Sequence, residues 1–288
     1  MESPKNISNN KPEWLRVKAC GTQKYLEVQS LLKQHNLHTI CQEANCPNRG
    51  ECFSHGTATF LILGPHCTRN CRFCSVVHGN PNPVDIDEPF NLARAVEILK
   101  LRHAVITSVT RDDLPDGGAG QFARVIKEIR KLPSKVSIEV LVPDFEGREE
   151  LVDIVLSESP DVFNHNIETV PRFYSEIRPQ ADYRRSLAVL AMASKRGKAA
   201  VKSGLMVGLG ESIDELKMVF LDLASIGVEY LTIGQYLAPS KAHYPIFKYH
   251  HPDEFSSLAI IAGECGIRHV FSAPLVRSSY HADEQYKR

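Results

Sequence analysis

The chain has 288 residues, of which 43% are hydrophobic and 24% charged, and its formal net charge is zero. This balance indicates a globular protein with a large core, and it excludes an overall field that would attract nucleic acid or an anionic membrane. No apolar run approaches the roughly 20 residues needed to span a bilayer, and the polar first residues do not resemble a signal peptide. We therefore expect a cytoplasmic monomer with no nucleic-acid or membrane partner.

The predicted elements alternate regularly after an irregular start. A short helix is expected over 27–37, where Val28, Leu31 and Leu32 recur at helical spacing. Apolar strands are predicted at 60–63, 103–109, 136–142, 162–166, 201–207 and 230–236. Helix-patterned segments lie between them, at 92–101, 122–131, 183–196 and 213–226.

Six βα units with largely apolar strands indicate a parallel sheet covered by helices. Polar residues gather where the strands end, which is where the loops of β/α barrels carry their chemistry. Because six units are too few to close the usual eight-stranded barrel, we predict an α/β fold that is an open, partial (β/α)6 TIM-like barrel. We divide the chain into an N-terminal extension (1–55), the barrel (56–265) and a C-terminal extension (266–288).

Six of the eight cysteines fall within residues 41–74. Of these, Cys67, Cys71 and Cys74 form a CxxxCxxC motif directly after the first predicted barrel strand. Three thiolates on one short loop suit a [4Fe-4S] cluster, and an iron without a protein ligand is open to a small molecule. A zinc loop is the alternative, although zinc prefers four ligands, commonly from paired CxxC units.

A second triplet, Cys41, Cys46 and Cys52, has the spacing CxxxxCxxxxxC. By itself it is compatible with a zinc site or with half of a ferredoxin-like site. The two remaining cysteines, Cys20 and Cys265, show no ligand spacing, and we interpret both as structural.

The CxxxCxxC motif, with Phe73 before its last cysteine, resembles the signature of radical S-adenosylmethionine enzymes. Beside the second triplet it resembles the lipoyl synthase family, and the likeness extends over nearly the whole chain. Its further blocks are Gly56-Thr-Ala-Thr-Phe-Leu-Ile-Leu-Gly64, Thr107-Ser-Val-Thr-Arg-Asp-Asp-Leu-Pro-Asp-Gly-Gly118, Asn164-His-Asn-Ile-Glu-Thr169, Lys202-Ser-Gly-Leu-Met-Val-Gly-Leu-Gly-Glu211, Gly234-Gln-Tyr-Leu-Ala-Pro-Ser240 and Arg277-Ser-Ser-Tyr280.

This resemblance implies two [4Fe-4S] clusters and S-adenosylmethionine as cofactors. In the family, the open iron of the radical cluster chelates S-adenosylmethionine, which one electron cleaves to methionine and a 5′-deoxyadenosyl radical. The ligands of that cluster would be Cys67, Cys71 and Cys74. The auxiliary cluster would be held by Cys41, Cys46, Cys52 and, through an unusual oxygen ligand, Ser279, in a segment that otherwise has the character of a solvated tail.

The resemblance also implies the reaction and the partners. An unactivated aliphatic C–H bond offers no acidic proton, so a radical is needed to break it. The implied reaction inserts sulfur from the auxiliary cluster at C6 and C8 of an octanoyl chain. That chain is carried by lipoyl carrier proteins, namely dehydrogenase E2 domains and the glycine-cleavage H protein. An electron donor such as ferredoxin or flavodoxin, and an iron–sulfur carrier, would be further partners.

Candidate contacts to S-adenosylmethionine or substrate lie mostly at strand ends, and four of them have a structural alternative. Phe73 would lie near the adenine or belong to the core, and Arg178 would pair with a carboxylate or hold a loop. The remaining candidates are Ser108 and Asp112, for which a helix cap and a turn are the alternative, and Asn166 and Glu168 as ribose ligands.

Two other functions remain open from the residues. Another radical enzyme that inserts sulfur is the nearest, although a biotin-synthase-like protein would not need the second triplet and a tRNA methylthiotransferase would add a basic RNA-binding domain. A zinc-stabilised binding module is the other, and metal content distinguishes it. The sequence does not specify the preferred carrier, the reductant or how the auxiliary cluster is rebuilt.

Overall fold

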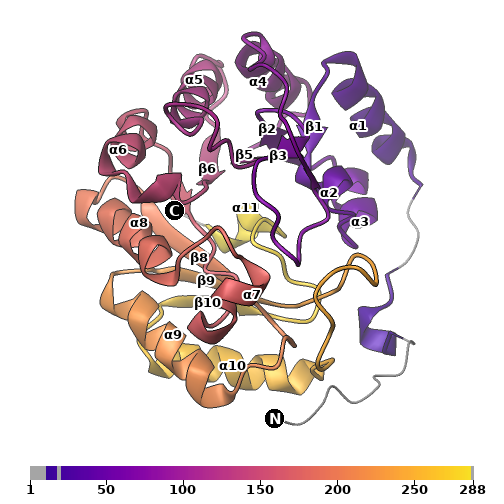
Figure 1. Cartoon of the computed structure of the whole chain (residues 1–288). Helices are drawn as coiled ribbons and strands as arrows, with labels where there is room; N and C mark the ends of the chain where they lie inside the picture. Colours follow the sequence, from indigo (N-terminus) through magenta and orange to yellow (C-terminus); the bar gives the residue numbers. More distant parts are fainter. Residues whose placement is uncertain (1–10, 18–20, 287–288) are drawn as a thin grey trace.

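The computed structural model describes residues 11–17 and 21–286, and within them a curved sheet is surrounded by helices (Figure 1). The sheet has the strand order β1-β2-β5-β6-β7-β8-β9-β10, and all neighbouring strands are parallel except β1 and β2. Its strands are β1 (His38–Thr39), β2 (Thr59–Ile62), β5 (His103–Ser108), β6 (Ser137–Leu141), β7 (Val162–Asn164), β8 (Ala200–Val207), β9 (Tyr230–Gln235) and β10 (His269–Ser272). A separate parallel pair is formed by β3 (His66–Cys67) and β4 (Val77–His78).

The sheet is an open partial barrel, as predicted. Among the described residues β1 and β10 form its two edges and do not pair with each other. All six predicted strands are present, and the structure adds β10 as a seventh parallel strand beside β9. This strand lies within 266–288, so the sheet continues into the segment that we assigned to a C-terminal extension.

An outer ring of helices follows the strands in chain order (Figure 1). Its members are α4 (Glu88–Ile98), α5 (Ala119–Arg130), α6 (Glu149–Ser157), α8 (Tyr183–Arg196), α9 (Ile213–Ser225) and α10 (Pro252–Glu264). Before the barrel come η1 (Glu13–Leu15), α1 (Gln23–Gln34), α2 (Ile40–Glu43) and α3 (Arg49–Ser54). The remaining short helices are η2 (Phe145–Gly147), η3 (Pro171–Phe173), α7 (Tyr174–Ile177) and α11 (Ala282–Gln285). No helix in the described part of the chain has the length and apolarity needed to cross a bilayer.

Local capping explains where α8 begins and ends. The Asp182 side chain accepts a hydrogen bond from the backbone N–H of Arg185 and so caps the first turn. At the other end Gly197 adopts φ 61°, a left-handed conformation that glycine reaches without strain. Both ends therefore coincide with the predicted segment 183–196.

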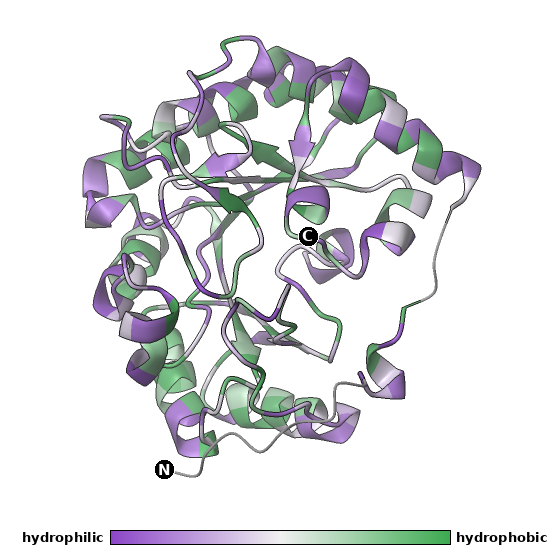
Figure 2. Cartoon of the chain, turned by 45° about the vertical axis from the view of Figure 1, so that its right-hand side comes forward, coloured by the Kyte–Doolittle hydropathy of each residue, from purple (hydrophilic) through white to green (hydrophobic). Residues whose placement is uncertain are grey.

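The core lies between the sheet and the helix ring. All residues of β2 and β9 are buried, as expected for parallel strands covered on both faces. The helices around the sheet alternate hydrophilic and hydrophobic segments along their length, as expected for helices that bury one face (Figure 2). A buried polar cluster also lies on neighbouring strands, where Glu139 accepts hydrogen bonds from Lys202 at 2.9 Å and from Asn164 at 3.0 Å.

Candidate active site

The CxxxCxxC loop lies beyond the end of β2, the first parallel strand of the barrel. Cys67 ends the short strand β3, and its Sγ accepts hydrogen bonds from the backbone N–H groups of Arg69 at 3.4 Å and Thr110 at 3.3 Å. Burial raises the pKa of Cys71, and it raises that of Cys74 to about 12. Neighbouring thiols of the same triplet add to both shifts, so the three sulfurs lie within electrostatic range of one another.

The chemistry of this donor set fits an iron–sulfur cluster. Across residues 11–17 and 21–286, no three His, Cys, Asp or Glu side chains are arranged to hold a single metal ion. The thiolates of a cubane cluster bind different irons and need not converge on one point. Three partly or fully buried thiols on one loop, two of them with raised pKa values, suit a cationic cluster that replaces their protons.

The second triplet and Ser279 meet in one cavity. This cavity has a volume of about 380 Å³, and its lining includes Cys41, Cys46, Cys52 and Ser279. The helices α2 and α3 carry Cys41 and Cys52, whereas Ser279 comes from the chain after β10. Segments more than 220 residues apart in sequence thus present three thiols and one hydroxyl to the same space.

Thr59, at the start of β2, interacts with both the N-terminal and the C-terminal residues that line this cavity. Its hydroxyl donates a hydrogen bond of 2.8 Å to Ser279 Oγ, and it also interacts with the Cys41 thiol. Burial, together with the neighbouring cysteines of the triplet, raises the pKa of Cys41 to about 11 and that of Cys52 to about 12. As in the CxxxCxxC loop, the donor set fits a cluster that replaces protons.

Asn166 and Glu168 follow β7 and lie beside the C-terminal segment. Asn166 donates from Nδ2 to Glu168 Oε1 at 3.1 Å and accepts from the Ser278 hydroxyl at 2.9 Å. Glu168 has φ 65°, a strained conformation for a residue other than glycine that persists only where the surrounding structure enforces it. Burial raises the pKa of Glu168, and Arg178 opposes that shift.

Arg277 lies near both the second cysteine triplet and Glu168. It lines the cavity of the second triplet, and the charges of Cys46 and Glu168 both act on its guanidinium, although burial lowers its pKa overall. The segment 277–279 therefore connects the lining of the cavity to Asn166. Sequence reasoning included Arg277 in a family motif but did not select it as a site residue.

Arg178, Phe73 and Ser108 have different surroundings. Arg178 donates from one nitrogen to the carbonyl oxygens of Asn166 and Ile167, so it holds the loop after β7, and its charge also lowers the pKa of Cys71. The half-buried Phe73 packs against the core. The Ser108 hydroxyl, at the end of β5, is buried and has no hydrogen-bond partner in the described part of the chain.

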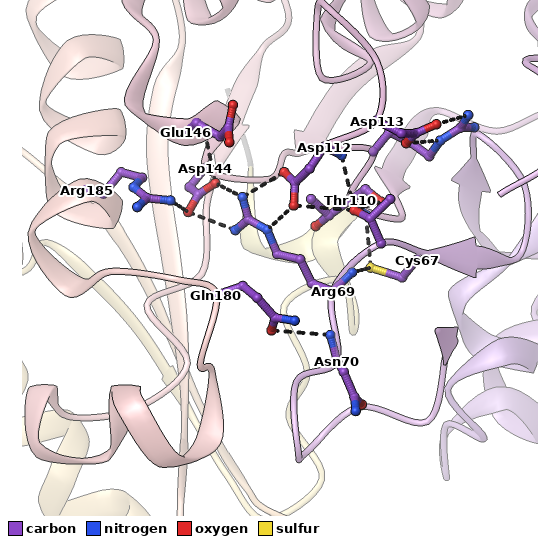
Figure 3. Close-up of polar contacts among 12 residues, drawn as sticks. Cys67, Arg69, Asn70, Thr110, Asp112, Asp113, Asp144, Glu146, Gln180 and Arg185 are labelled. Carbon is purple, nitrogen blue, oxygen red and sulfur yellow. Dashed lines mark hydrogen bonds and ion pairs between the residues drawn. The ribbon is translucent and has the colours of Figure 1, made fainter. Parts of the chain in front are cut away.

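Asp112 is engaged by a residue that the sequence analysis missed. Both of its carboxylate oxygens accept hydrogen bonds from Arg69, at 2.7 and 2.9 Å (Figure 3). Its carboxylate is thus directed to the cysteine loop. Arg69 lies inside the CxxxCxxC motif, but its partners follow other strands and no local pattern identifies them. Cys20 lies outside the described residues, and Cys265 follows α10 as a free cysteine.

Comparisons with known proteins show the family of this chain. The radical SAM superfamily model matches residues 61–223. Lipoyl synthase of Caldicellulosiruptor saccharolyticus is 54% identical over 98% of this chain and 99% of its own length. Lipoyl synthase of Hahella chejuensis is 53% identical over 96% of this chain and 83% of its own.

Solved structures show the same fold at low identity. Methylornithine synthase superimposes with a TM-score of 0.54 at 13% identity, over 91% of this chain and 86% of that one. Streptococcus suis SuiB bound to its precursor peptide SuiA gives 0.58 at 12% identity, over 95% of this chain and 57% of that one. The sequence, the fold and the two sets of cysteines of the chain described here together place it in the lipoyl synthase family, as a radical sulfurtransferase that uses S-adenosylmethionine and two [4Fe-4S] clusters.

Proposed function

We propose that Cys67, Cys71 and Cys74 hold the radical cluster, and that the auxiliary cluster is held by Cys41, Cys46, Cys52 and Ser279. The observation that carries this proposal is the single cavity lined by all four of the latter residues. Thiolates bind iron–sulfur clusters readily, whereas an oxygen ligand is a poorer match to soft sulfide-bridged iron. Ser279 is therefore the ligand suited to leave when the cluster gives up its sulfur.

The bound cofactors supply a carbon radical and sulfur for insertion at C6 and C8 of the octanoyl chain. The chain's own residues position the reactants. Asn166 and Glu168 offer an amide and a carboxylate for ribose hydroxyls, and the unpartnered Ser108 hydroxyl offers a further polar contact. Phe73 lies next to Cys74 and offers an aromatic face for the adenine.

The partners follow from the substrate. We propose that the chain acts on octanoylated lipoyl carrier domains, those of dehydrogenase E2 proteins and the glycine-cleavage H protein. A ferredoxin or flavodoxin would deliver the electron, and an iron–sulfur carrier would rebuild the auxiliary cluster. We further propose that the protein works as a monomer in the cytoplasm.

Iron analysis of two triple variants tests the ligand assignment. The native protein should hold about eight irons with matching acid-labile sulfide, as two cubane clusters require. Replacing Cys41, Cys46 and Cys52 by alanine should leave about four irons and preserve cleavage of S-adenosylmethionine to 5′-deoxyadenosine, but abolish sulfur insertion. Replacing Cys67, Cys71 and Cys74 should abolish both reactions. Zinc in place of iron, or 5′-deoxyadenosine formation by the second variant, would contradict the assignment.

A further inference from the structure

Arg69, between Cys67 and Cys71, connects the CxxxCxxC loop to two neighbouring strands of the barrel (Figure 3). Its guanidinium donates to Asp112 in the loop after β5 at 2.7 and 2.9 Å, and to Asp144 in the loop after β6 at 2.8 and 2.9 Å. The side chain is only 7% exposed. Four charge-assisted bonds in this fork geometry fix both the position and the orientation of the group.

Asp144 is the more buried of the two carboxylates that bind Arg69. Its side chain is fully buried, and it accepts further hydrogen bonds from Arg185 of α8 at 3.3 Å and from the backbone N–H of Glu146 at 3.1 Å. Burial alone would raise the pKa of Asp144, but Arg69 outweighs burial and holds the pKa at about 2. The Arg69–Asp144 pair is thus an ion pair at neutral pH, and two arginines balance the charges of Asp112 and Asp144.

The same residues control two hydrogen bonds to a cluster thiolate. The backbone N–H of Arg69 and that of Thr110 are the donors to Cys67 Sγ. Thr68 also links the cysteine loop to the loop after β5. Its hydroxyl donates to the carbonyl oxygen of Thr110 and accepts from the backbone N–H of Asp112. One of the N–H groups that donate to Cys67 Sγ lies in the loop after β5, and the other lies in the cysteine loop. The Arg69–Asp112 bonds therefore hold these two loops together.

We propose that Arg69, through Asp112 and Asp144, is a positioning residue that fixes the two N–H···S bonds at Cys67 and so sets the reduction potential of the radical cluster. This inference rests on the proposed role of Cys67 as a cluster ligand. Hydrogen bonds to cluster sulfurs are among the factors that set iron–sulfur potentials. They stabilise the more negative, reduced state, so their loss lowers the potential and hinders the reduction that cleavage of S-adenosylmethionine requires.

The chain offers a matched control in the adjacent pair Arg111 and Asp113. These residues bind each other through two hydrogen bonds of 2.9 Å. Arg111 also donates to the carbonyl oxygen of Leu63. Asp113 thus has the same charge as Asp112 and is next to it in sequence, but its arginine partner is outside the cysteine motif.

The experiment uses full-length protein with Cys41, Cys46 and Cys52 replaced by alanine as the parent, so that one cluster is observed. In that parent we compare Arg69→Lys, Asp112→Asn and the control Asp113→Asn. Redox titration gives the potential, and electron paramagnetic resonance of the reduced cluster gives a spectroscopic signature. Arg69→Lys keeps the charge and loses the four-bond fork, so it should lower the potential and broaden the spectrum at unchanged iron content.

The Asp112→Asn variant distinguishes two effects on the reduction potential, that of displaced N–H donors and that of a lost negative charge. Removing a negative charge near a cluster would by itself raise the potential. The proposal requires the opposite shift, because the donors are displaced, while Asp113→Asn leaves the potential unchanged or slightly higher. If Arg69→Lys loses its cluster, the shift in Asp112→Asn alone decides the proposal.

Parental potentials and spectra in both Arg69→Lys and Asp112→Asn would overturn the proposal, as would a higher potential in Asp112→Asn. Failure of the proposed function is distinguishable, because it would appear in the parent itself. A parent without any cluster would refute the role of Cys67 and with it this inference. A parent with eight irons would refute only the auxiliary ligands, and the three variants would still be compared by their potentials.

Discussion

Ser279 differs chemically from the other proposed ligands, because it offers an oxygen where the other six offer sulfur. Its hydroxyl lies in the cavity of the second cysteine triplet and is fixed by Thr59 at 2.8 Å. A hydroxyl ligand binds soft, sulfide-bridged iron less well than a thiolate does. A cluster that must be dismantled in each reaction benefits from one ligand that leaves readily.

The Ser279→Cys variant tests this lability. We expect the variant to hold as much iron as the native protein, since a thiolate is a good ligand. Its lipoyl formation should fall by roughly tenfold or more, which corresponds to about 1.4 kcal/mol or more in the rate-limiting barrier. Ser256→Cys, on the exposed face of α10, is the control for an added thiol. Full activity of Ser279→Cys would rule out the lability argument.

Individual residues also show what sequence patterns can and cannot predict. The six clustered cysteines were identifiable because each triplet is local in sequence. The contacts of Arg69 with Asp144 and of Thr59 with Ser279 join distant segments, as do the charges of Cys46 and Glu168 that act on Arg277, so only the fold reveals them. Asp112 was selected from a motif, but its carboxylate is bound by Arg69, a partner that no spacing rule specifies.

Strand β8 is the element on which the inner arrangement of the site depends. A Cβ atom at Gly204 would lie 2.8 Å from Asn166 Oδ1 and 2.9 Å from Ser278 Oγ, as well as 2.5 Å from Thr232 Oγ1. A glycine here therefore lets the segment after β7 and the C-terminal segment meet. These three distances are shorter than real contacts, so any larger residue must displace the neighbouring side chains.

Gly204→Ala should weaken binding of S-adenosylmethionine to the cluster-loaded protein at least tenfold, because it displaces Asn166 from its position. Equilibrium titration measures this effect. The matched control is Gly263→Ala in α10, where no heavy atom lies within 4 Å of the new methyl group. That change should leave binding intact and stabilise the helix by about 1 kcal/mol. Native affinity in Gly204→Ala would contradict the proposed role of Asn166.

The strands β6 and β8 are also joined by a buried ion pair between Glu139 and Lys202. Glu139→Gln leaves the buried lysine without its counter-charge, which should cost about 3–5 kcal/mol in the free energy of unfolding. The double variant Glu139→Gln/Lys202→Met should recover much of that loss, because no unpaired charge remains. Urea denaturation of the three proteins checks both expectations. Equal stability of the native and Glu139→Gln proteins would contradict this account.

The same pair predicts a pH dependence. Burial acts to raise the pKa of Glu139, but Lys202 and His103 outweigh it and lower the pKa from 4.5 to about 2. A depressed folded-state pKa contributes stability that is fully present above the unfolded value and is lost as the pH falls through the folded value. The stability difference between native protein and Glu139→Gln should therefore shrink between about pH 4.5 and pH 2. A difference that stays constant over that range would refute the assignment.

Elements with strong periodicity were predictable, and short edge strands were not. Helix α8 has its apolar spacing and both end signals in the sequence. Strand β10 has four residues with only two apolar side chains, and β1 has two residues. Neither carries an alternating pattern long enough to indicate a strand, and both depend on pairing with a neighbour that the fold supplies.

At the scale of the whole molecule, the barrel brings together two sites built in different ways. The proposed radical site comes from loops after neighbouring strands, which places its residues near one another by topology. The cavity proposed for the auxiliary cluster instead forms where the N-terminal helices and the C-terminal segment come together beside β2. The open sheet, with β1 and β10 as its edges, leaves room for both of these segments.

The assignment of the chain as a sulfur-inserting enzyme is tested most directly by intact mass. An octanoylated lipoyl domain is incubated anaerobically with reconstituted protein, S-adenosylmethionine and a strong reductant. We predict a product that has gained two sulfur atoms and lost two hydrogen atoms. Formation of 5′-deoxyadenosine without that mass change would reject the acceptor or the auxiliary cluster. Neither product, from protein verified to hold both clusters, would contradict the account as a whole.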